Sequence, residues 1–296
     1  MKKILYPCFI TLAAIALKAS PYAPERVSDS SLGDLIYAYN TTDQRLDYIS
    51  EGMRASQSIE WGLVDKAVKI KTTDPEGDLS TVSFRYGPAG NRNMRISRGK
   101  KILYVGGVEY DVDSQTITAY FRNGSYSPVA KVEISDGTRE HEYFVRDNLG
   151  NSLLTVDDSG NVIEGKSHGR YDPWGQPWQA DGTVEELKED SRGFTGHENV
   201  SFAGMIHMNG RMYDPMLGQF TAPDVFIQNA SIGVGLNRYA YIGNSPVNGI
   251  DPTGWVGVGS ILNQRNIDAI VDFTSNNFVN WWDAAKSHPY TPEVRV

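Results

Sequence analysis

The stretch DNLGNSLLTVDDSGN, residues 147–161, decides the fold expected for this chain. A turn-forming segment, DNLGN, leads into the strand-like run Ser152–Val156, and a second turn, 158–161, follows at once. In such turns an aspartate side chain can accept hydrogen bonds from backbone N–H groups, and a glycine can adopt positive φ. A short strand between two of them predicts an antiparallel hairpin unit.

The same unit recurs along most of the chain. Further turns are expected at 74–77, 86–92, 171–175 and 213–218. Strand-like runs lie at Thr81–Arg85, Lys101–Val105, Thr116–Arg122, Val129–Ile134 and His141–Val145, and earlier strand-like stretches lie at 31–39, 45–49 and 65–73. Repeated hairpins bury their faces against their neighbours. We therefore expect an all-β protein whose antiparallel strands form a strip or partial shell of sheet.

Composition supports this expectation and argues against one class of partner. The chain has 296 residues, with 29 glycines and 16 tyrosines, which suits many short strands joined by tight turns. Its formal net charge is −8, and no cluster of lysine and arginine stands out in the body. A basic patch is the usual mark of a nucleic-acid surface, so we expect no nucleic-acid binding through the shell.

Residues 1–19 have the pattern of a secretory signal peptide. A basic start is followed by an uncharged, mostly apolar run from Ile4 to Leu17, and Ala19 is a small residue suited to a cleavage point. Lys18, next to that point, favours the alternative of an apolar start without a targeting role. Cys8 is the only cysteine, so a processed chain would have neither disulfides nor cysteine ligands. We expect a protein that is secreted or held in the cell envelope.

Several stretches resemble a known family. FRYGPAGNR (84–92) and YVGGVEYD (104–111) look like YD-repeat, or RHS-repeat, sequence. GFTGHENVSFAGMIHMNGRMYDPMLGQFTAPD (193–224) and LNRYAYIGNSPVNGIDPTGW (236–255) resemble the RHS repeat-associated core domain. That family includes bacterial polymorphic toxins and the C components of toxin complexes. The resemblance implies a spiral β-sheet wall around a hollow interior, which in toxin members encloses a C-terminal cargo.

With the resemblance, which covers roughly Thr81 to Trp255, the chain is expected to divide into five segments. These are the signal peptide (1–19), a strand-rich N-terminal segment (20–80), YD/RHS repeats (81–190), the RHS core domain (191–255) and a short variable tail (256–296). Apolar residues spaced by three and four between Ile267 and Ala285 predict an amphipathic helix in the tail. The body is short for a complete shell, so a partner chain is expected to complete the wall. An immunity protein is a further expected partner of a toxin member.

The resemblance assigns a catalytic site to Arg211, Asp224 and Asp251. In related core domains two aspartates, assisted by an arginine, form an intramolecular aspartyl protease, and all three positions here carry the matching residue types. Two carboxylates in close contact share one proton, so one can activate water while the other protonates or polarises the scissile carbonyl. The implied cut lies between Trp255 and Val256, in a single turnover.

Two departures from the family pattern favour an alternative without catalysis. Gln219 stands where the family usually has arginine, and residues 225–235 replace a shorter loop. In this alternative Asp224 and Asp251 only cap turns, and Arg211 forms an ion pair. The chain would then be a structural or adhesive module that presents its sheet to a surface carbohydrate or a protein, or a degenerate RHS fragment.

Other motifs give weaker signals. Glu198 follows His197, and with His207 the pair could suggest a metal site or a general base. Because no ligand spacing joins the histidines, we interpret them as structural and expect no metal and no cofactor. Ser260 is not part of a Gly-x-Ser-x-Gly motif, so serine hydrolase chemistry is not expected.

Overall fold

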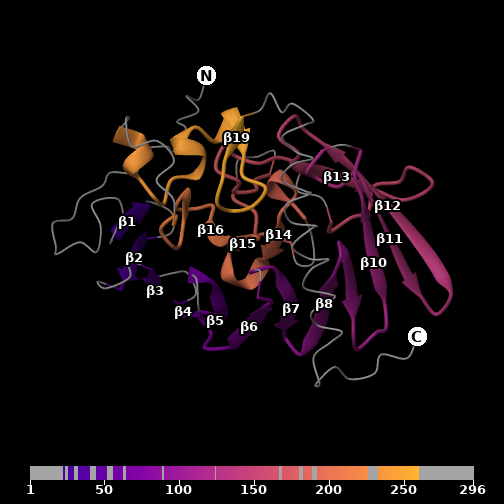
Figure 1. Ribbon diagram of the computed structural model, residues 1–296, viewed down its shortest axis with the longest axis horizontal. Coiled ribbons are helices and arrows are strands. Elements are labelled where there is room, and N and C mark those ends of the chain that lie inside the picture. Colours follow the sequence, from indigo (N-terminus) through magenta and orange to yellow (C-terminus); the bar gives the residue numbers. More distant parts are fainter. Residues whose placement is uncertain are drawn as a thin grey trace.

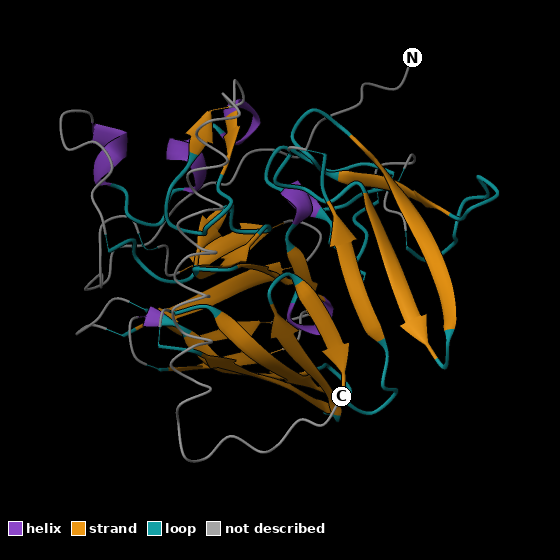
Figure 2. Cartoon of the chain, turned by 45° about the vertical axis from the view of Figure 1, so that its right-hand side comes forward, coloured by secondary structure: helices purple, strands orange, loops and turns teal. Residues whose placement is uncertain are grey.

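The computed structural model describes residues 23, 26–29, 33–40, 45–51, 56–62, 65–88, 90–123, 125–166, 169–179, 183–188, 192–225 and 233–259. The expected signal peptide, the expected tail helix and Ser260 lie outside these residues. Within them the chain is almost entirely antiparallel β-structure, which confirms the predicted all-β class. Strands and turns dominate Figure 2, and the helices are short. No helix in the described part is long and apolar enough to cross a membrane.

Thirteen strands form one sheet in which each strand pairs with the next one in the sequence. They are β1 (Arg26–Asp29), β2 (Gly33–Tyr39), β3 (Leu46–Glu51), β4 (Ser56–Trp61), β5 (Ala67–Thr73), β6 (Leu79–Tyr86), β7 (Arg92–Ser97), β8 (Lys100–Val105), β9 (Val108–Asp111), β10 (Ile117–Phe121), β11 (Ala130–Ser135), β12 (Thr138–Arg146) and β13 (Ser152–Val156). Over the described residues β1 and β13 do not pair with each other, so the sheet is an open strip. In Figure 1 the strip runs along the lower side and up the right-hand side of the molecule.

The strands that follow form two smaller sheets. The first, called the core sheet below, consists of β14 (Glu198–Val200), β15 (Met205–Met208), β16 (Arg211–Asp214) and β17 (Gln219–Phe220). The second pairs β18 (Gly249–Ile250) with β19 (Val258–Gly259). Short 3-10 helices lie at Phe194–Gly196, Ser201–Ala203, Gly233–Leu236, Tyr241–Asn244 and Pro246–Asn248. Figure 1 shows β14–β16 inside the curve of the strip.

The turns follow the predicted chemistry, with one shift of register. Asp147 Oδ1 accepts hydrogen bonds from the amides two and four residues later, both at 2.9 Å. In the next turn Asp157, and not the predicted Asp158, accepts from the amides two and four residues later, at 2.9 and 2.8 Å. Gly150 and Gly160 have φ of 81° and 82°. The glycine therefore stands three residues after the capping aspartate, which is why the cap moves back to Asp157.

The core sheet is buried on both faces. Side chains alternate along a strand, so Met205 and Met212 face the strip while Ile206 and Tyr213 face the opposite side. The strip-side cluster also contains Tyr37, Leu46, Ile59, Ala67, Ile70, Val82, Phe84, Val200, Ala203 and Leu217. The other cluster also contains Leu187, Phe194, Met208, Phe220 and Tyr241. The core sheet is thus packed between the wall and an aromatic layer.

A buried ion cluster also fastens the core sheet to the strip. Glu198 on β14 accepts hydrogen bonds from Arg95 Nη1 and Tyr104 Oη, each at 2.8 Å to Oε1, and its Oε2 contacts Arg92. Burial opposes ionisation of Glu198, but the arginine charges outweigh it and lower its pKa. The predicted strand runs did not include β7, because its buried side chains are Arg95 and Ser97 rather than an apolar series.

Candidate functional site

Three segments converge beside the core sheet. Arg211 begins β16, Asp224 follows β17, and Asp251 comes directly after β18. Their exposed fractions are only 2%, 3% and 2%. Three charged side chains are seldom buried unless they compensate one another. The structure therefore brings together the three residues that the sequence predicted for one site.

Arg211 is the centre of this cluster. Its Nη2 lies 3.0 Å from Asp224 Oδ2 and 3.8 Å from Asp251 Oδ2. Its Nε donates to the Gly254 carbonyl at 2.5 Å, and its Nη1 donates to the Arg238 carbonyl at 3.0 Å. Burial lowers the pKa of Arg211 and the two carboxylates oppose that shift. Because each guanidinium nitrogen has an oxygen partner, the side chain has a fixed place between the two aspartates.

Asp251 caps the turn that contains the predicted scissile bond. Its Oδ1 accepts hydrogen bonds from the Thr253 amide and hydroxyl, both at 3.2 Å, and from the Trp255 amide at 3.1 Å. The amides two and four residues after the aspartate are the same donors that cap the repeat turns. The Val256 amide is an additional donor, at 3.1 Å. Asp251 therefore contacts the nitrogen of the bond between Trp255 and Val256.

Burial decides the titration of Asp251. Loss of hydration raises the pKa of this carboxyl, and the opposing effects of Arg211 and of the hydrogen bonds from Thr253 are smaller. A carboxyl with a raised pKa keeps its proton to higher pH than an ordinary aspartate. This is the property required of a group that donates a proton.

The turn is fixed against the hairpin between β15 and β16. Asn209 Nδ2 donates to the Pro252 carbonyl at 2.8 Å, and the Gly210 amide donates to the Thr253 carbonyl at 2.7 Å. A Cβ placed on Gly254, which has φ of 72°, would lie 2.0 Å from the carbonyl oxygen of Met208. Sequence reasoning did not assign a role to Asn209 and Gly210 in this site, although an Asn-Gly pair is a recognised signal for a tight hairpin turn.

The predicted cleavage residues lie at the edge of this buried region. Trp255 is partly buried, and Val256 is 46% exposed. After the bond the chain turns back, and Val258 pairs with Ile250 across the β18–β19 ladder. The bond is therefore held from both sides while Val256 reaches solvent.

The two buried histidines have structural contacts. His197 Nδ1 lies 2.9 Å from Thr195 Oγ1, and burial lowers its pKa to about 3. His207 Nδ1 accepts from the Asn209 amide at 3.1 Å, so the ring carries its proton on Nε2, which lies 3.0 Å from Tyr86 Oη. Burial also lowers the pKa of His207, so both rings are neutral. Among the described residues no group of three His, Cys, Asp or Glu side chains could hold a metal ion.

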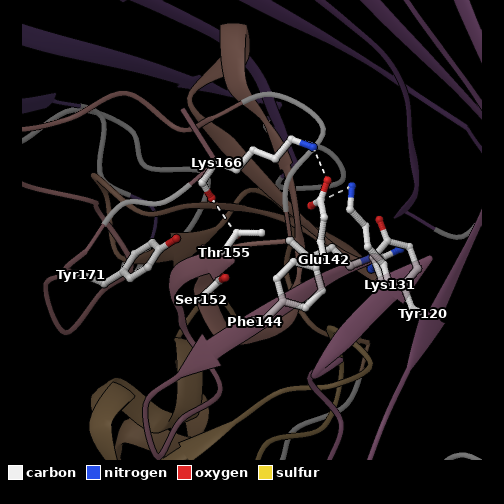
Figure 3. A pocket seen from close by; sticks show the side chains of 10 residues that line it. Tyr120, Lys131, Glu142, Phe144, Ser152, Thr155, Lys166 and Tyr171 are labelled. Atoms are coloured by element: carbon white, nitrogen blue, oxygen red, sulfur yellow. Dashed lines mark hydrogen bonds and ion pairs between the residues drawn. The ribbon is translucent and has the colours of Figure 1, made fainter. Parts of the chain in front are cut away.

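A separate pocket lies between β10–β13 and the segment that follows (Figure 3). In it Lys131 lies 3.2 Å from Glu142, and Lys166 contacts the same carboxylate. The other lining residues are Tyr120, Phe144, Ser152, Thr155, Tyr171, Arg192 and Gly193. None of the predicted site residues lines this pocket, and its lysines already contact a carboxylate.

Comparisons with known proteins find sequence relatives and similar solved structures for this chain. No protein-family model matches it. It is 25% identical over 225 residues to the tRNA nuclease WapA of Bacillus subtilis, which covers 72% of this chain and 9% of that protein. It is 28% identical over 254 residues to salivary gland surface protein 1 of Aedes aegypti, which covers 84% of this chain and 7% of that protein. The chain thus spans less than a tenth of these relatives.

Solved toxin-complex structures resemble the fold. The crystal structure of TcdB2–TccC3 matches with a TM-score of 0.53 at 16% identity, over 77% of this chain and 13% of the matched chain. The Tc holotoxin pore of Photorhabdus luminescens matches with a TM-score of 0.50 at 16% identity, over 78% of this chain and 13% of that one. The described chain therefore shares its fold with a segment of these toxin-complex chains.

Proposed function

We propose that this chain is part of an RHS-repeat shell that cuts its own backbone once, between Trp255 and Val256. One observation carries the proposal: Asp251 Oδ1 lies 3.1 Å from the Val256 nitrogen. Its Oδ2 faces the same Arg211 nitrogen that holds Asp224. Two carboxyl groups and the bond to be cut are thus gathered around one guanidinium.

The geometry supports the following division of roles. Asp224, paired with Arg211, takes a proton from a water molecule as the water oxygen adds to the carbonyl carbon of Trp255. In the resting chain the Val256 N–H donates to Asp251 Oδ1. Once the water oxygen has added, the Val256 nitrogen is an amine with a basic lone pair. Asp251, whose pKa burial raises, then donates its proton to this nitrogen as the C–N bond breaks. Trp255 then ends in a carboxyl group and Val256 begins with an amine. One water is consumed, and the proton lost by Asp251 is matched by the one gained by Asp224.

The scissile bond is part of the same chain as the catalytic groups, so a modest catalyst is sufficient for one cleavage. The scissile bond belongs to the same turn as Asp251, so no substrate has to be bound from solution and its reacting atoms are already oriented. The chain after the bond is the leaving product. A single turnover is the expected behaviour, because the cut carboxyl end remains attached to the site.

The wider setting also supports a toxin-related shell. The sequence similarity to a segment of WapA and the fold similarity to toxin-complex chains support that class. The strip is open, and the similar solved structures are of assemblies with more than one component, which supports a partner chain that completes the wall. The pattern of residues 1–19 supports export by a signal peptide.

Intact mass of the full chain tests the proposal. We expect the wild type to yield two fragments that meet between Trp255 and Val256, and Asp224→Asn and Asp251→Asn to stay whole. Asparagine keeps a side-chain oxygen that can cap the turn at position 251 and accept from Arg211 at position 224, so both variants should fold. Asp157→Asn is the matched control, because it changes a cap in an exposed repeat turn, and it should be cut like the wild type. A wild type that stays whole in every preparation overturns the proposal.

A second candidate function is a structural or adhesive module without catalysis. The observation in its favour is that Asp251 Oδ1 caps its turn with the donors used in the repeat turns, so its presence has a purely structural explanation. On this hypothesis, both aspartate variants and the wild type remain whole. A destabilised but uncut Asp251→Asn chain beside an uncut wild type would support it.

A further inference from the structure

A buried lysine from the wall reaches the predicted cleavage turn. Lys66 lies between β4 and β5, in a connection closed by a hydrogen bond from the Gly62 amide to the Lys66 carbonyl at 2.8 Å. Only 6% of Lys66 is exposed. Its Nζ donates to the Asn209 carbonyl at 3.2 Å, at the hairpin that supports the turn. Within the described part of the chain no carboxylate forms an ion pair with it.

The contacts of this lysine point to Trp255. Lys66 Nζ lies 5.4 Å from the centroid of the Trp255 ring and 5.4 Å from that of Tyr86. The Arg211 guanidinium carbon lies 5.0 Å from the Trp255 ring. A cation within about 6 Å of an aromatic face is attracted by its quadrupole, most strongly for tryptophan. Two cations from different parts of the fold therefore hold one indole.

A glycine makes room for this ring. A Cβ on Gly210 would lie 2.5 Å from Trp255 Nε1, so the indole sits directly against the backbone of the β15–β16 turn. The ring thus has one wall of glycine backbone and two neighbouring cations. Trp255 is the residue that precedes the proposed cut, so these contacts surround the side chain on the acyl side of the bond.

We propose that Lys66 is a positioning residue for self-cleavage, which recognises the aromatic side chain of Trp255 and so holds the scissile carbonyl at the two aspartates. This inference rests on the proposed function. It links the chemistry to the wall, because Lys66 lies between two strands of the strip, while Asp224 follows the core sheet and Asp251 follows β18. A cut at this site would then require that the early strands are folded around the core. Small displacements of reacting atoms reduce rates steeply, which gives such a contact its effect.

The titration of Lys66 predicts a pH dependence of cleavage that tests its positioning role. Burial first, and then the charges of Arg211 and Arg92, lower its pKa to about 8. Tyr86 and Trp255 face it with their rings, and Asn209 faces it with a carbonyl. As pH rises through about 8, Lys66 loses the charge that attracts the indole. The ratio of the wild-type cleavage rate to that of Lys66→Met is therefore expected to decline toward one on the alkaline side of about pH 8.

The experiment follows cleavage of the full chain made by cell-free translation, with a chase and separation of whole and cut chains. We expect Lys66→Met to slow cleavage about tenfold at pH 7, from loss of one buried cation–ring contact. Lys66→Arg should restore the rate and move the alkaline decline to higher pH. Trp255→Phe should be cut faster than Trp255→Leu. Lys71→Met is the matched control, because Lys71 pairs at the surface with Glu60 at 2.7 Å, and it should match the wild type.

A second measurement separates positioning from folding. In a chain kept whole by Asp224→Asn, a double-mutant cycle of Lys66→Met and Trp255→Leu is followed by thermal unfolding. A positive coupling supports the contact; additive effects overturn it. Cleavage of Lys66→Met at the wild-type rate overturns the positioning role but leaves the aspartate mechanism standing. An uncut wild type overturns the proposed function and this inference together.

Discussion

The turns at Asp157 and Asp251 have the same backbone pattern in two different settings. In each, one carboxylate oxygen accepts from the amides two and four residues later, and a glycine with positive φ lies between those positions. Hydrogen bonding, led by the Asn161 side chain, lowers the pKa of the exposed Asp157. Burial raises the pKa of Asp251. One turn type can therefore hold either an inert cap or a candidate acid, and burial decides between them.

The residue four positions after the aspartate determines what the second carboxylate oxygen, Oδ2, contacts. In the repeat turn Asn161 Nδ2 donates to Asp157 Oδ2 at 3.1 Å, and Asn151 does the same for Asp147 at 2.7 Å. The residue at the corresponding place after Asp251 is Trp255, whose side chain contacts Lys66 and Arg211 instead. Asp251 Oδ2 is thereby left to face Arg211 and, through it, Asp224. With tryptophan at this position, Asp251 Oδ2 lacks the asparagine donor that the repeat turns supply and faces Arg211 instead.

The largest difference between the two turns is expected in how an Asp→Asn change affects the rate of cleavage. Asp251→Asn should reduce the rate at least ~100-fold, because loss of a general acid has effects of that size, while Asp157→Asn should leave the rate unchanged. Both rates are measured from the whole and cut chains in a pulse and chase. Equal cleavage rates for Asp251→Asn and Asp157→Asn would mean that Asp251 does not act as the acid.

The next difference between the two turns is in stability, and it concerns the side chain that faces the aspartate Oδ2: Arg211 for Asp251 and Asn161 for Asp157. Arg211→Met should destabilise the fold by about 3–5 kcal/mol, because it leaves two buried carboxylates without their cation. It also leaves the carbonyls of Gly254 and Arg238 without their donor. Asn161→Ala removes the side chain that donates to Asp157 Oδ2 in the exposed repeat turn, and it should change stability little. Urea unfolding of the purified proteins gives both values, and a mild Arg211→Met would mean that the carboxylates are protonated in the folded chain.

The sequence predicts the repeated parts better than the exceptional ones. Alternation and turn chemistry place strands such as β8 and β13 within a residue or two. They do not find β7, whose buried Arg95 pairs with Glu198 on a strand distant in sequence. The resemblance predicts Arg211, Asp224 and Asp251 as one site, and both aspartates lie near the same Arg211 nitrogen, at 3.0 and 3.8 Å. Lys66 was not predicted, because no local pattern shows that a lysine in the wall will meet Trp255.

A third contrast uses the glycine of each turn. Gly160→Ala should cost about 1 kcal/mol, since its φ of 82° strains an alanine but nothing lies within 4 Å of the added Cβ. Gly254→Ala should cost about 3 kcal/mol or more, because strain is joined by overlap with the core sheet. Its Cβ would lie 2.0 Å from Met208 O and 2.9 Å from the amides of Gly210 and Arg211. Thermal unfolding compares the two, and equal shifts would show that the cleavage turn can leave the hairpin without cost.

The smallest difference is in how the free energy of unfolding depends on pH. The contributions of Asp251 and Asp157 are expected to change with pH in opposite directions. The folded chain holds the proton of Asp251 more tightly than the unfolded chain does, so this group's contribution to stability falls as pH rises through its raised pKa. The pKa of Asp157 is lowered, so its contribution grows as pH rises from that pKa toward the unfolded value. In a chain kept whole by Asp224→Asn, the free energy of unfolding is compared with and without each further Asp→Asn change from about pH 3 to 6. Opposite slopes are expected. Slopes of the same sign would mean that hydrogen bonds, and not burial, govern Asp251, and it would then lose its claim to act as the acid.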